Sequence, residues 1–312
     1  MTDQLYGGIE GGGTKFVCAI MEANGQILTE SHFDTTNPQT TLSTCAEFFE
    51  SHAHLGTLSA LGIASFGPVD PNLNSPTYGH ILNTPKPGWS HTDVVAFFRR
   101  RLGLPIAFDS DVNGAALAEQ IWGAGKGLAN FVYYTIGTGI GAGVILDGRL
   151  VHGALTPEMG HMRVPHDRAI DPFEGSCPFH GDCLEGLANG PALEKRWKTS
   201  AENLPPDHPA WPLEADYLAA MLHNTICTFT PERVIMGGGV MSQTQLFPMI
   251  HQRLKRSLNN YIQLPAIEDR IEDYVVHTPL EGKAGVLGAL ALALSLNPKQ
   301  NQRRHNERHF AE

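Results

Sequence analysis

The chain lacks a long apolar run. A helix that spans a bilayer needs about 18 or more consecutive apolar residues, and the apolar stretch GVLGALALALSL at 285–296 is shorter than that. The first residues, MTDQLYGG, also lack the basic start and the apolar core of a secretory signal. From these two absences we expect a cytoplasmic protein without a membrane partner.

Cysteine and basic residues are also scarce. Five cysteines, an odd number in 312 residues, do not indicate a disulfide framework. Cys18, Cys45 and Cys227 lie in apolar periodic segments, so we expect them in the core. The formal net charge is −10, whereas nucleic-acid binding requires a basic face, so we expect no nucleic-acid partner. The basic run NQRRHNERH lies in a polar tail, 297–312, which we interpret as a solvated terminus.

One pattern, strand–glycine loop–strand–turn–strand, occurs twice. The first copy reads LYGGIE, GGGT, KFVCAIME, ANG and QILTESHF, and the second reads FVYYTIG, TGIGAG, GVIL, DG and RLVHG. Asp147-Gly148, between two β-rich runs, indicates a hairpin. The spacing of about 125 residues between the copies indicates an internal duplication, and the chain length suggests about two domains.

The remaining pattern predicts alternating strands and helices. We expect a helix that begins near Asp93, capped by Ser90 or Thr92, and ends at Gly103. Another helix begins near Asp111, directly after the strand LPIAFDSD. The further predicted elements are helices at 41–54, 243–260 and 282–296, and the strands ALGIASFG, RVIMGGGV and DYVVHTP.

The glycine loops indicate a nucleotide site. Consecutive glycines let the backbone approach a phosphate and present N–H groups to it. GTGIGA at 137–142 also matches a dinucleotide motif, but that motif requires a helix directly after it, and here a strand and a hairpin follow. The alternative to a nucleotide site is that the glycines only permit tight turns between the strands. Two loops at equivalent places favour a cleft in which both contact one nucleotide.

The stretch CPFHGDCLEG at 177–186 has metal-binding spacing. Cys177, His180 and Cys183 stand at intervals of three, and both residue types are zinc ligands. The spacing alone leaves a nucleic-acid finger, a catalytic metal, a structural brace or coincidence open. A finger would need a basic recognition helix, and LEGLANGPALEKRW, which follows, opens acidic and is broken by glycine.

Seven motifs in order give a family resemblance. GIEGGGTK, DVNGAALAE, IGTGIGAG, EMGH, the Cys/His segment with LEG, GGGV and AGVLGA resemble the ROK family of bacterial sugar kinases and repressors over residues 7–295. The chain is most similar to the zinc-containing fructokinase branch. The resemblance implies an α/β, actin/hexokinase-like (ribonuclease H-like) duplicated fold, with ATP and Mg²⁺ in a cleft and a small structural zinc site. We expect an N-terminal domain over 1–117, completed by helix 282–296, and a zinc-bearing C-terminal domain over 118–281.

The resemblance also implies which residues meet the sugar. Asp111 is the expected general base on a sugar hydroxyl, although from the residues alone it could be only a helix N-cap. Many ROK kinases have Asn before this Asp, and this chain has Ser110, so that contact stays open. The other expected sugar-side residues are Glu158 and His161 of EMGH, Glu185 of LEG, and Asn83 with Lys86 on a lid loop.

On the nucleotide side, Glu10 stands where most of the family has Asp near the Mg²⁺-phosphate, and the fructokinase branch tends to carry Glu. Gly237 to Gly239 match the adenosine-side turn, for which a simple strand-to-helix turn is the alternative. The full set of implied nucleotide contacts is Glu10, Gly11, Gly12, Gly13, Thr14, Lys15, Gly137, Thr138, Gly139, Gly237, Gly238 and Gly239.

The resemblance makes His161 the fourth ligand, with Cys177, His180 and Cys183, of a closed and therefore structural zinc site. The metal would then brace Glu158 and Glu185. We expect its removal to reduce sugar affinity and folding before it affects nucleotide binding.

Together these expectations describe an ATP-dependent kinase that phosphorylates the 6-hydroxyl of D-fructose. Mannose, glucose or N-acetylglucosamine are alternative substrates. Small changes in a sugar pocket are enough to accommodate a hydroxyl of the opposite orientation, so the sequence discriminates poorly among hexoses. The non-enzyme alternative is a sugar-responsive ROK repressor. Such repressors carry a helix-turn-helix before the first glycine loop, which this chain reaches by residue 11. A homodimer is implied by the resemblance alone.

Overall fold

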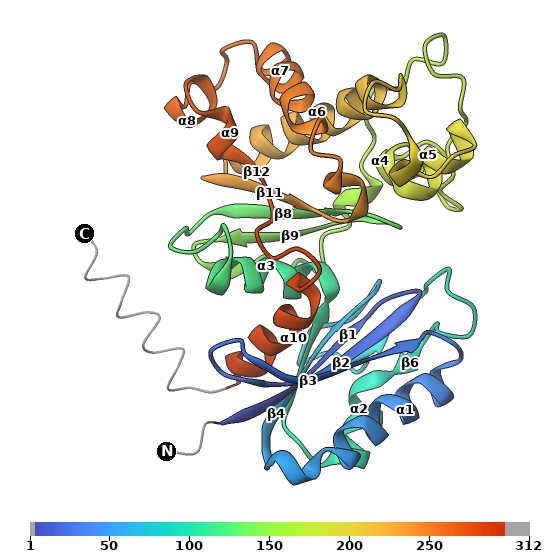
Figure 1. The fold of residues 1–312 in the computed structure, drawn as a ribbon, viewed down its shortest axis with the longest axis vertical. Helices are drawn as coiled ribbons and strands as arrows, with labels where there is room; N and C mark the ends of the chain where they lie inside the picture. Colours follow the sequence, from blue (N-terminus) through green and yellow to red (C-terminus); the bar gives the residue numbers. More distant parts are fainter. Residues whose placement is uncertain (1–3, 297–312) are drawn as a thin grey trace. The chain divides into compact units, whose positions relative to one another are not determined.

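The computed structural model describes residues 4–296, so the predicted polar tail, 297–312, lies outside the described residues. The described chain divides into two compact units (Figure 1). Unit 1 holds residues 4–121, 152–156 and 282–296, and unit 2 holds residues 122–151 and 157–281. The predicted domain ranges, 1–117 and 118–281, stay predictions.

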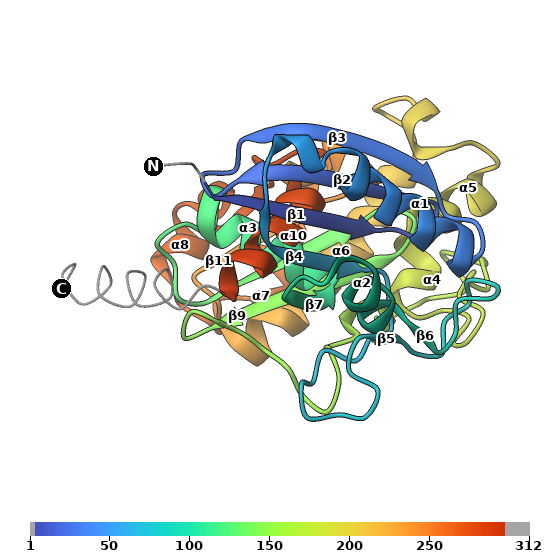
Figure 2. The same ribbon diagram turned by 90° about the horizontal axis from the view of Figure 1, so that it is seen from below.

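Unit 1 is built on a five-stranded sheet whose order is β3-β2-β1-β4-β7, as Figure 2 shows for its first four strands. The strands are β1 (Leu5–Gly11), β2 (Lys15–Glu22), β3 (Ile27–Asp34), β4 (Leu58–Ser65) and β7 (Ile106–Ser110). The first three are antiparallel, and β4 and β7 run parallel to β1. Strand β3 alternates between half-buried and exposed residues because it forms an edge, whereas β4 is almost wholly buried.

Helices cover both faces of this sheet. Consecutive residues of a strand point to opposite faces, and a Cβ on Gly7 would meet Phe49 of the first helix, whereas one on Gly8 would meet Ala289 of the last. Gly62 leaves no room for a Cβ against the backbone of Ala289, so its glycine permits the last helix to pack closely. The remaining elements of unit 1 are α1 (Pro38–Ser51), η1 (Ala53–Leu55), β5 (His80–Ile81), β6 (Thr92–Asp93), α2 (Val94–Leu102), α3 (Asp111–Trp122, whose last residue falls in unit 2) and α10 (Ala284–Ser295).

The predicted cap of α2 is wrong. Asp93 caps this helix, because its Oδ1 accepts a hydrogen bond from Ala96 N at 2.9 Å. Ser90 and Thr92 lie before that position, and Ser90 instead bonds to the backbone of Thr84. The predicted end of the helix is confirmed, since Gly103 adopts the left-handed conformation directly after Leu102.

Unit 2 repeats the sheet of unit 1, which confirms the predicted duplication. Its order is β10-β9-β8-β11-β12, with an antiparallel set of three followed by two strands parallel to β8. Asp147 and Gly148 both have positive φ, as the predicted two-residue hairpin requires. The strands are β8 (Phe131–Ile136), β9 (Ile140–Leu146), β10 (Arg149–Leu150), β11 (Arg233–Gly237) and β12 (Val275–His277).

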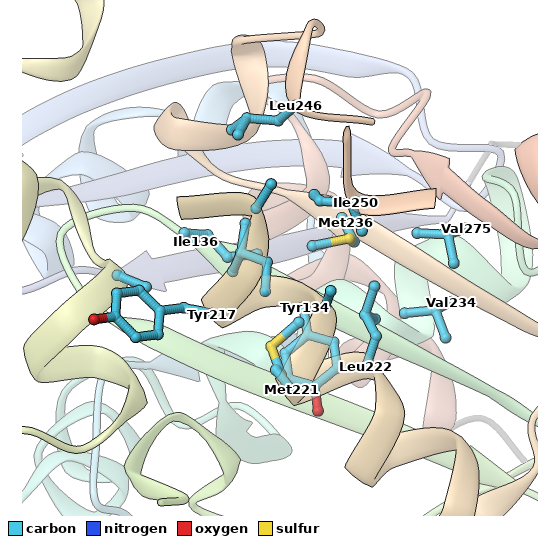
Figure 3. Close-up of a cluster of buried hydrophobic side chains, with 14 of the residues drawn as sticks. Tyr134, Ile136, Tyr217, Met221, Leu222, Val234, Met236, Leu246, Ile250 and Val275 are labelled. Atoms are coloured by element: carbon cyan, nitrogen blue, oxygen red, sulfur yellow. The ribbon is translucent and has the colours of Figure 1, made fainter. Parts of the chain in front are cut away.

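The core of unit 2 lies between this sheet and two long helices. Figure 3 shows Tyr134 of the sheet beside Met221 and Leu222, and Met236 of the sheet beside Ile250. The Tyr134 hydroxyl hydrogen-bonds Thr225 Oγ1 at 2.6 Å. The helices of unit 2 are η2 (Met159–His161), α4 (Leu184–Ala188), α5 (Gly190–Trp197), η3 (Ala201–Asn203), α6 (Ala210–Phe229), η4 (Gly239–Ser242), α7 (Leu246–Leu258), α8 (Pro265–Glu268) and α9 (Ile271–Tyr274).

The cysteine predictions hold in two cases of three. Cys18 and Cys45 are fully buried, as expected. Cys227 is exposed, so its predicted core position is wrong. It lies in α6, where its neighbour Ile226 is buried, and successive helix residues point about 100° apart. Within residues 4–296, no helix combines the length and apolar character that crossing a bilayer requires.

Candidate active site

The first glycine loop is a tight turn between β1 and β2. Gly12 N donates to Lys15 O at 2.9 Å, and Thr35 Oγ1 donates to Gly12 O at 2.7 Å. A Cβ on Gly12 would lie 2.8 Å from Lys15 O, whereas one on Gly13 would meet nothing within 4 Å. Gly13, Thr14 and Lys15 are exposed and Gly11 is buried. The turn therefore has a fixed base and an open tip that a phosphate could approach.

Glu10 precedes this turn, and its carboxylate lies against the first turn of α10. Gly285 leaves no room for a Cβ there, because Glu10 fills the space. Burial raises the pKa of Glu10, and the charge of Lys15 opposes that rise. A helix N-terminus favours negative charge, and Mg²⁺ prefers carboxylate oxygens. The donor chemistry at Glu10 therefore suits a divalent cation.

Asp111 stands where strand β7 ends and helix α3 begins. Its Oδ1 accepts a hydrogen bond from Val112 N at 2.9 Å. Ser110 Oγ accepts a hydrogen bond from Asn113 N at 3.3 Å, which is the contact that a helix N-cap makes. Ser110 therefore takes the capping role that was the alternative interpretation of Asp111. Asp111 is half-buried on a rigid junction, a position that suits a carboxylate that must reach a substrate hydroxyl.

A network around the buried Asp109, which the sequence does not predict, holds this junction. Asp109 Oδ1 accepts from Ser110 N and from Asn113 Nδ2, each at 2.7 Å, and its Oδ2 lies 2.8 Å from His152 Nε2. The hydrogen bond with Asp109 raises the pKa of His152, although burial opposes it. The sequence FDSD does place Asp109 in a buried strand, where a carboxylate needs a partner. It does not indicate that His152, far along the chain, is that partner.

The predicted lid residues lie on the loop between β5 and β6. Asn83 is exposed and Lys86 is half-buried. Trp89 anchors the far end of the loop, because its Nε1 donates to Thr36 O at 2.7 Å and its ring stacks on Phe16 at 5.3 Å. The structure gives the loop a fixed base, and the sugar contacts of Asn83 and Lys86 stay predictions.

In unit 2 the structure brings the two predicted glycine turns together. The turn at 137–139 follows β8 and the turn at 237–239 ends β11, and these strands are parallel neighbours. A Cβ on Gly137 would lie 3.8 Å from Gly239 N, and one on Gly239 would meet nothing within 4 Å. Gly238 has a φ of 92°, which favours glycine. The two turns thus form one backbone-lined edge.

Two predicted sugar-side carboxylates also lie near each other in unit 2. Glu185 Oε2 accepts a hydrogen bond from Ile140 N at 2.9 Å, directly after the first of these turns. Desolvation, and secondly the negative charge of Glu185, raise the pKa of Glu158. A pair of carboxylates offers several acceptors to the hydroxyls of a polyol. Glu185, however, already uses one oxygen to hold the glycine turn.

The four predicted metal ligands converge. The ligand atoms of His161, Cys177, His180 and Cys183 all lie within 4.8 Å of one another. His161 Nδ1 lies 3.5 Å from Cys183 Sγ and 3.8 Å from Cys177 Sγ, and His180 Nδ1 lies 3.7 Å from Cys177 Sγ. Tetrahedral zinc, with bonds of about 2.1 Å to nitrogen and 2.3 Å to sulfur, separates such atoms by roughly 3.6 Å. The donor set and its spacing therefore fit a closed zinc site.

Comparisons with known proteins cover almost the whole chain. The family model described as the ROK family matches residues 6–295. The chain is 43% identical to a fructokinase of Lactococcus lactis subsp. cremoris over 95% of this chain and 99% of the relative. It is 42% identical to a fructokinase of Zymomonas mobilis subsp. mobilis, over 95% of this chain and 98% of the relative.

The solved structures agree with the fold. A ROK family glucokinase from Streptomyces griseus, crystallised with glucose and AMPPNP, has a TM-score of 0.75 at 26% identity and covers 93% of this chain and 99% of its own. A ROK hexokinase from Thermus thermophilus has a TM-score of 0.76 at 25% identity, and the match covers 94% of this chain and 99% of the hexokinase. The predicted kinase fold is confirmed, and the chain belongs to the ROK family.

Proposed function

We propose that this protein is an ATP-dependent fructokinase that transfers the γ-phosphoryl group of ATP to the 6-hydroxyl of D-fructose. The observation that carries the proposal is the identity of 42–43% to two proteins named fructokinase, over nearly the full length of both partners. A related glucokinase of the same fold was crystallised with a sugar and an ATP analogue, which supports a sugar and a nucleotide as the two substrates.

Asp111 is the general base in this proposal. As the fructose oxygen attacks the γ-phosphorus, the Asp111 carboxylate accepts the hydroxyl proton, and the bond from that phosphorus to the β–γ bridging oxygen breaks to release ADP. The network of Asp109, Asn113 and His152 holds the junction that carries this carboxylate. Rigid placement matters because general-base catalysis depends on hydrogen-bond reach to the proton.

The other predicted residues take binding roles. Glu158 and Glu185 accept hydrogen bonds from sugar hydroxyls, with Asn83, Ser110 and His161 as further sugar-side residues. The backbone at Gly11–Gly13, Thr14 and Lys15, at Gly137–Gly139 and at Gly237–Gly239 binds the nucleotide. Glu10 would hold Mg²⁺, which neutralises charge on the phosphates. His161, Cys177, His180 and Cys183 would hold a structural zinc ion.

Glucose is the principal alternative substrate, because the Streptomyces griseus relative was crystallised with it. A coupled ADP-release assay with Mg-ATP and fructose, glucose, mannose or N-acetylglucosamine separates the possibilities. We expect kcat/KM for fructose to exceed that for each other sugar by at least about tenfold. Equal values for glucose or mannose would contradict the fructose assignment alone, and no ADP release with any sugar would contradict the kinase assignment.

We further propose that the protein works as a homodimer in the cytoplasm, as the family resemblance implies. Sedimentation equilibrium of the purified protein tests the dimer. A single species of the mass of one chain, 33.9 kDa, at all loading concentrations would contradict it.

A further inference from the structure

The segment that follows the last metal ligand lies along the glycine turn of unit 2. After Cys183 come α4, Asn189 and α5. Three hydrogen bonds join this segment to the turn: Glu185 Oε2 with Ile140 N at 2.9 Å, Asn189 Nδ2 with Thr138 O at 2.8 Å, and Gly190 N with Gly137 O at 2.8 Å. The turn is therefore held along its length by one neighbouring segment.

Asn189 is fixed in its orientation by a second contact. Its Oδ1 accepts a hydrogen bond from Ala192 N at 2.8 Å and caps α5, while its Nδ2 donates to Thr138 O. The side chain is buried. Because a trans peptide is planar, its carbonyl and its N–H point in opposite directions. Drawing the Thr138 carbonyl towards Asn189 therefore directs the Gly139 N–H to the other face of the turn, where a phosphate would accept it.

The same segment is bonded to the metal ligands. Leu184 N donates to Met162 O at 2.9 Å, and Met162 directly follows His161. Ser176 N donates to Gly186 O at 2.8 Å, and Ser176 directly precedes Cys177. The metal cluster, the segment 184–190 and the glycine turn thus form one continuous hydrogen-bonded body within unit 2.

We propose that Asn189 is a positioning residue that couples the metal centre to nucleotide affinity. The proposal rests on the proposed function, since it takes the turn at 137–139 as a nucleotide contact. It departs from the sequence-based expectation that metal loss affects sugar affinity before nucleotide binding, because the segment bonded to the metal ligands also holds the nucleotide turn. Coupling between two binding equilibria is reciprocal, so a bound nucleotide must also tighten zinc binding.

The substitution Asn189→Asp isolates the contact. Asp caps a helix as well as Asn does, but it puts an acceptor oxygen opposite the Thr138 carbonyl in place of the donor. We expect the Kd for ADP to rise about tenfold, the effect of losing one buried hydrogen bond. Asn189→Ser keeps the helix cap and removes the amide without adding charge, so its Kd for ADP must also rise.

Asn37→Asp is the matched control. Asn37 caps α1 through the same kind of contact, with its Oδ1 accepting from Thr40 N at 2.9 Å and a proline in the first turn of the helix. Its side chain is exposed and belongs to unit 1. If an Asn-to-Asp change at any helix cap weakened ADP binding, Asn37→Asp would weaken it too. If the weaker binding comes from losing the contact with Thr138 O, Asn37→Asp should bind ADP as the wild type does.

The experiment measures four quantities on each metal-loaded protein: the Kd for ADP and the Kd for fructose by calorimetry, the zinc content, and the Kd for zinc by competition with a chromogenic chelator, with and without ADP. We expect ADP to lower the Kd for zinc in the wild type and in Asn37→Asp, and not in the Asn189 variants. Zinc content should stay near one equivalent in all four, and fructose affinity should stay within about twofold of wild type.

Unchanged ADP affinity in both Asn189 variants would overturn the inference, as would a wild-type Kd for zinc that ADP does not alter. These results leave the proposed function intact if fructose is still phosphorylated. A wild type that binds no ADP would overturn the proposed function and this inference together, and a protein that binds no zinc would overturn the coupling alone.

Discussion

His152 Nε2 lies 2.8 Å from Asp109 Oδ2, and this pair ties residues 152–156 to the junction that carries Asp111. Asp109 is buried, with 4% of its surface exposed, and its other oxygen holds Ser110 N and Asn113 Nδ2. The hydrogen bond to Asp109 raises the pKa of His152 against the opposing effect of burial. The strength of the junction therefore depends on pH.

The first prediction concerns that dependence. Because the folded pKa of His152 lies above its unfolded value, the stabilisation is fully present below about pH 6.5 and is lost as pH rises through the folded pKa. We expect His152→Gln to lower the free energy of unfolding by about 1 kcal/mol at pH 6 and by much less at pH 9, a modest value because the side chain is partly exposed. Urea unfolding at both pH values measures this.

The matched control for that experiment is His32→Gln, which removes a histidine that lies 2.7 Å from Glu30 on an exposed edge strand. We expect almost no change at either pH, since exposed pairs contribute little. Equal destabilisation of the His152 variant at pH 6 and pH 9 would mean that packing, and not the ion pair, is what the residue contributes.

A second prediction concerns the place of Glu10 against α10. Gly285→Ala puts a methyl group into the space that the Glu10 carboxylate fills, so we expect the free energy of unfolding to fall by about 1–3 kcal/mol. The double variant with Glu10→Ala should recover most of that loss. Gly13→Ala, where a Cβ meets nothing within 4 Å, should stay within about 0.5 kcal/mol of wild type. Strictly additive losses in the double variant would show that the two residues do not compete for space.

The duplicated architecture could be predicted because it depends on local patterns. Two strand–glycine–strand units with their turns specify the antiparallel strands β1 to β3 and β8 to β10, and Asp147-Gly148 specifies a hairpin by its backbone preference alone. The zinc site could also be predicted from the sequence, because three of its four ligands, Cys177, His180 and Cys183, lie within seven residues. Each of these features is determined by residues that are close together in the sequence.

Features that depend on distant partners could not be predicted. Asp109 and His152 are 43 residues apart, and Asn189 and Thr138 are 51 residues apart, so neither pair leaves a spacing signal. The apolar segment around Cys227 predicts a core position, but Cys227 is exposed, because which residues of a helix are buried depends on what packs against that helix.

A third prediction tests the metal centre. We expect about one equivalent of zinc in the purified protein, and less than about 0.1 in Cys183→Ser, because three remaining ligands leave the site open. The variant should also unfold at a lower temperature, since metal binding contributes to folding. Cys227→Ser, a change to an exposed cysteine in the same unit, should keep both zinc content and Tm. Less than about half an equivalent of zinc in the wild type would count against a structural site.

A ³¹P NMR time course of Mg-ATP and D-fructose, with the wild type and with Asp111→Asn, tests the proposed fructokinase function directly. We expect the wild type to convert ATP and fructose into equal amounts of ADP and fructose 6-phosphate. The Asp111 variant should keep its fructose affinity and lose about 10²–10⁴-fold in kcat, the range for a positioned general base. The kinase function is contradicted if the wild type forms no phosphorylated sugar, and the role of Asp111 is contradicted if Asp111→Asn turns over at a rate near that of the wild type.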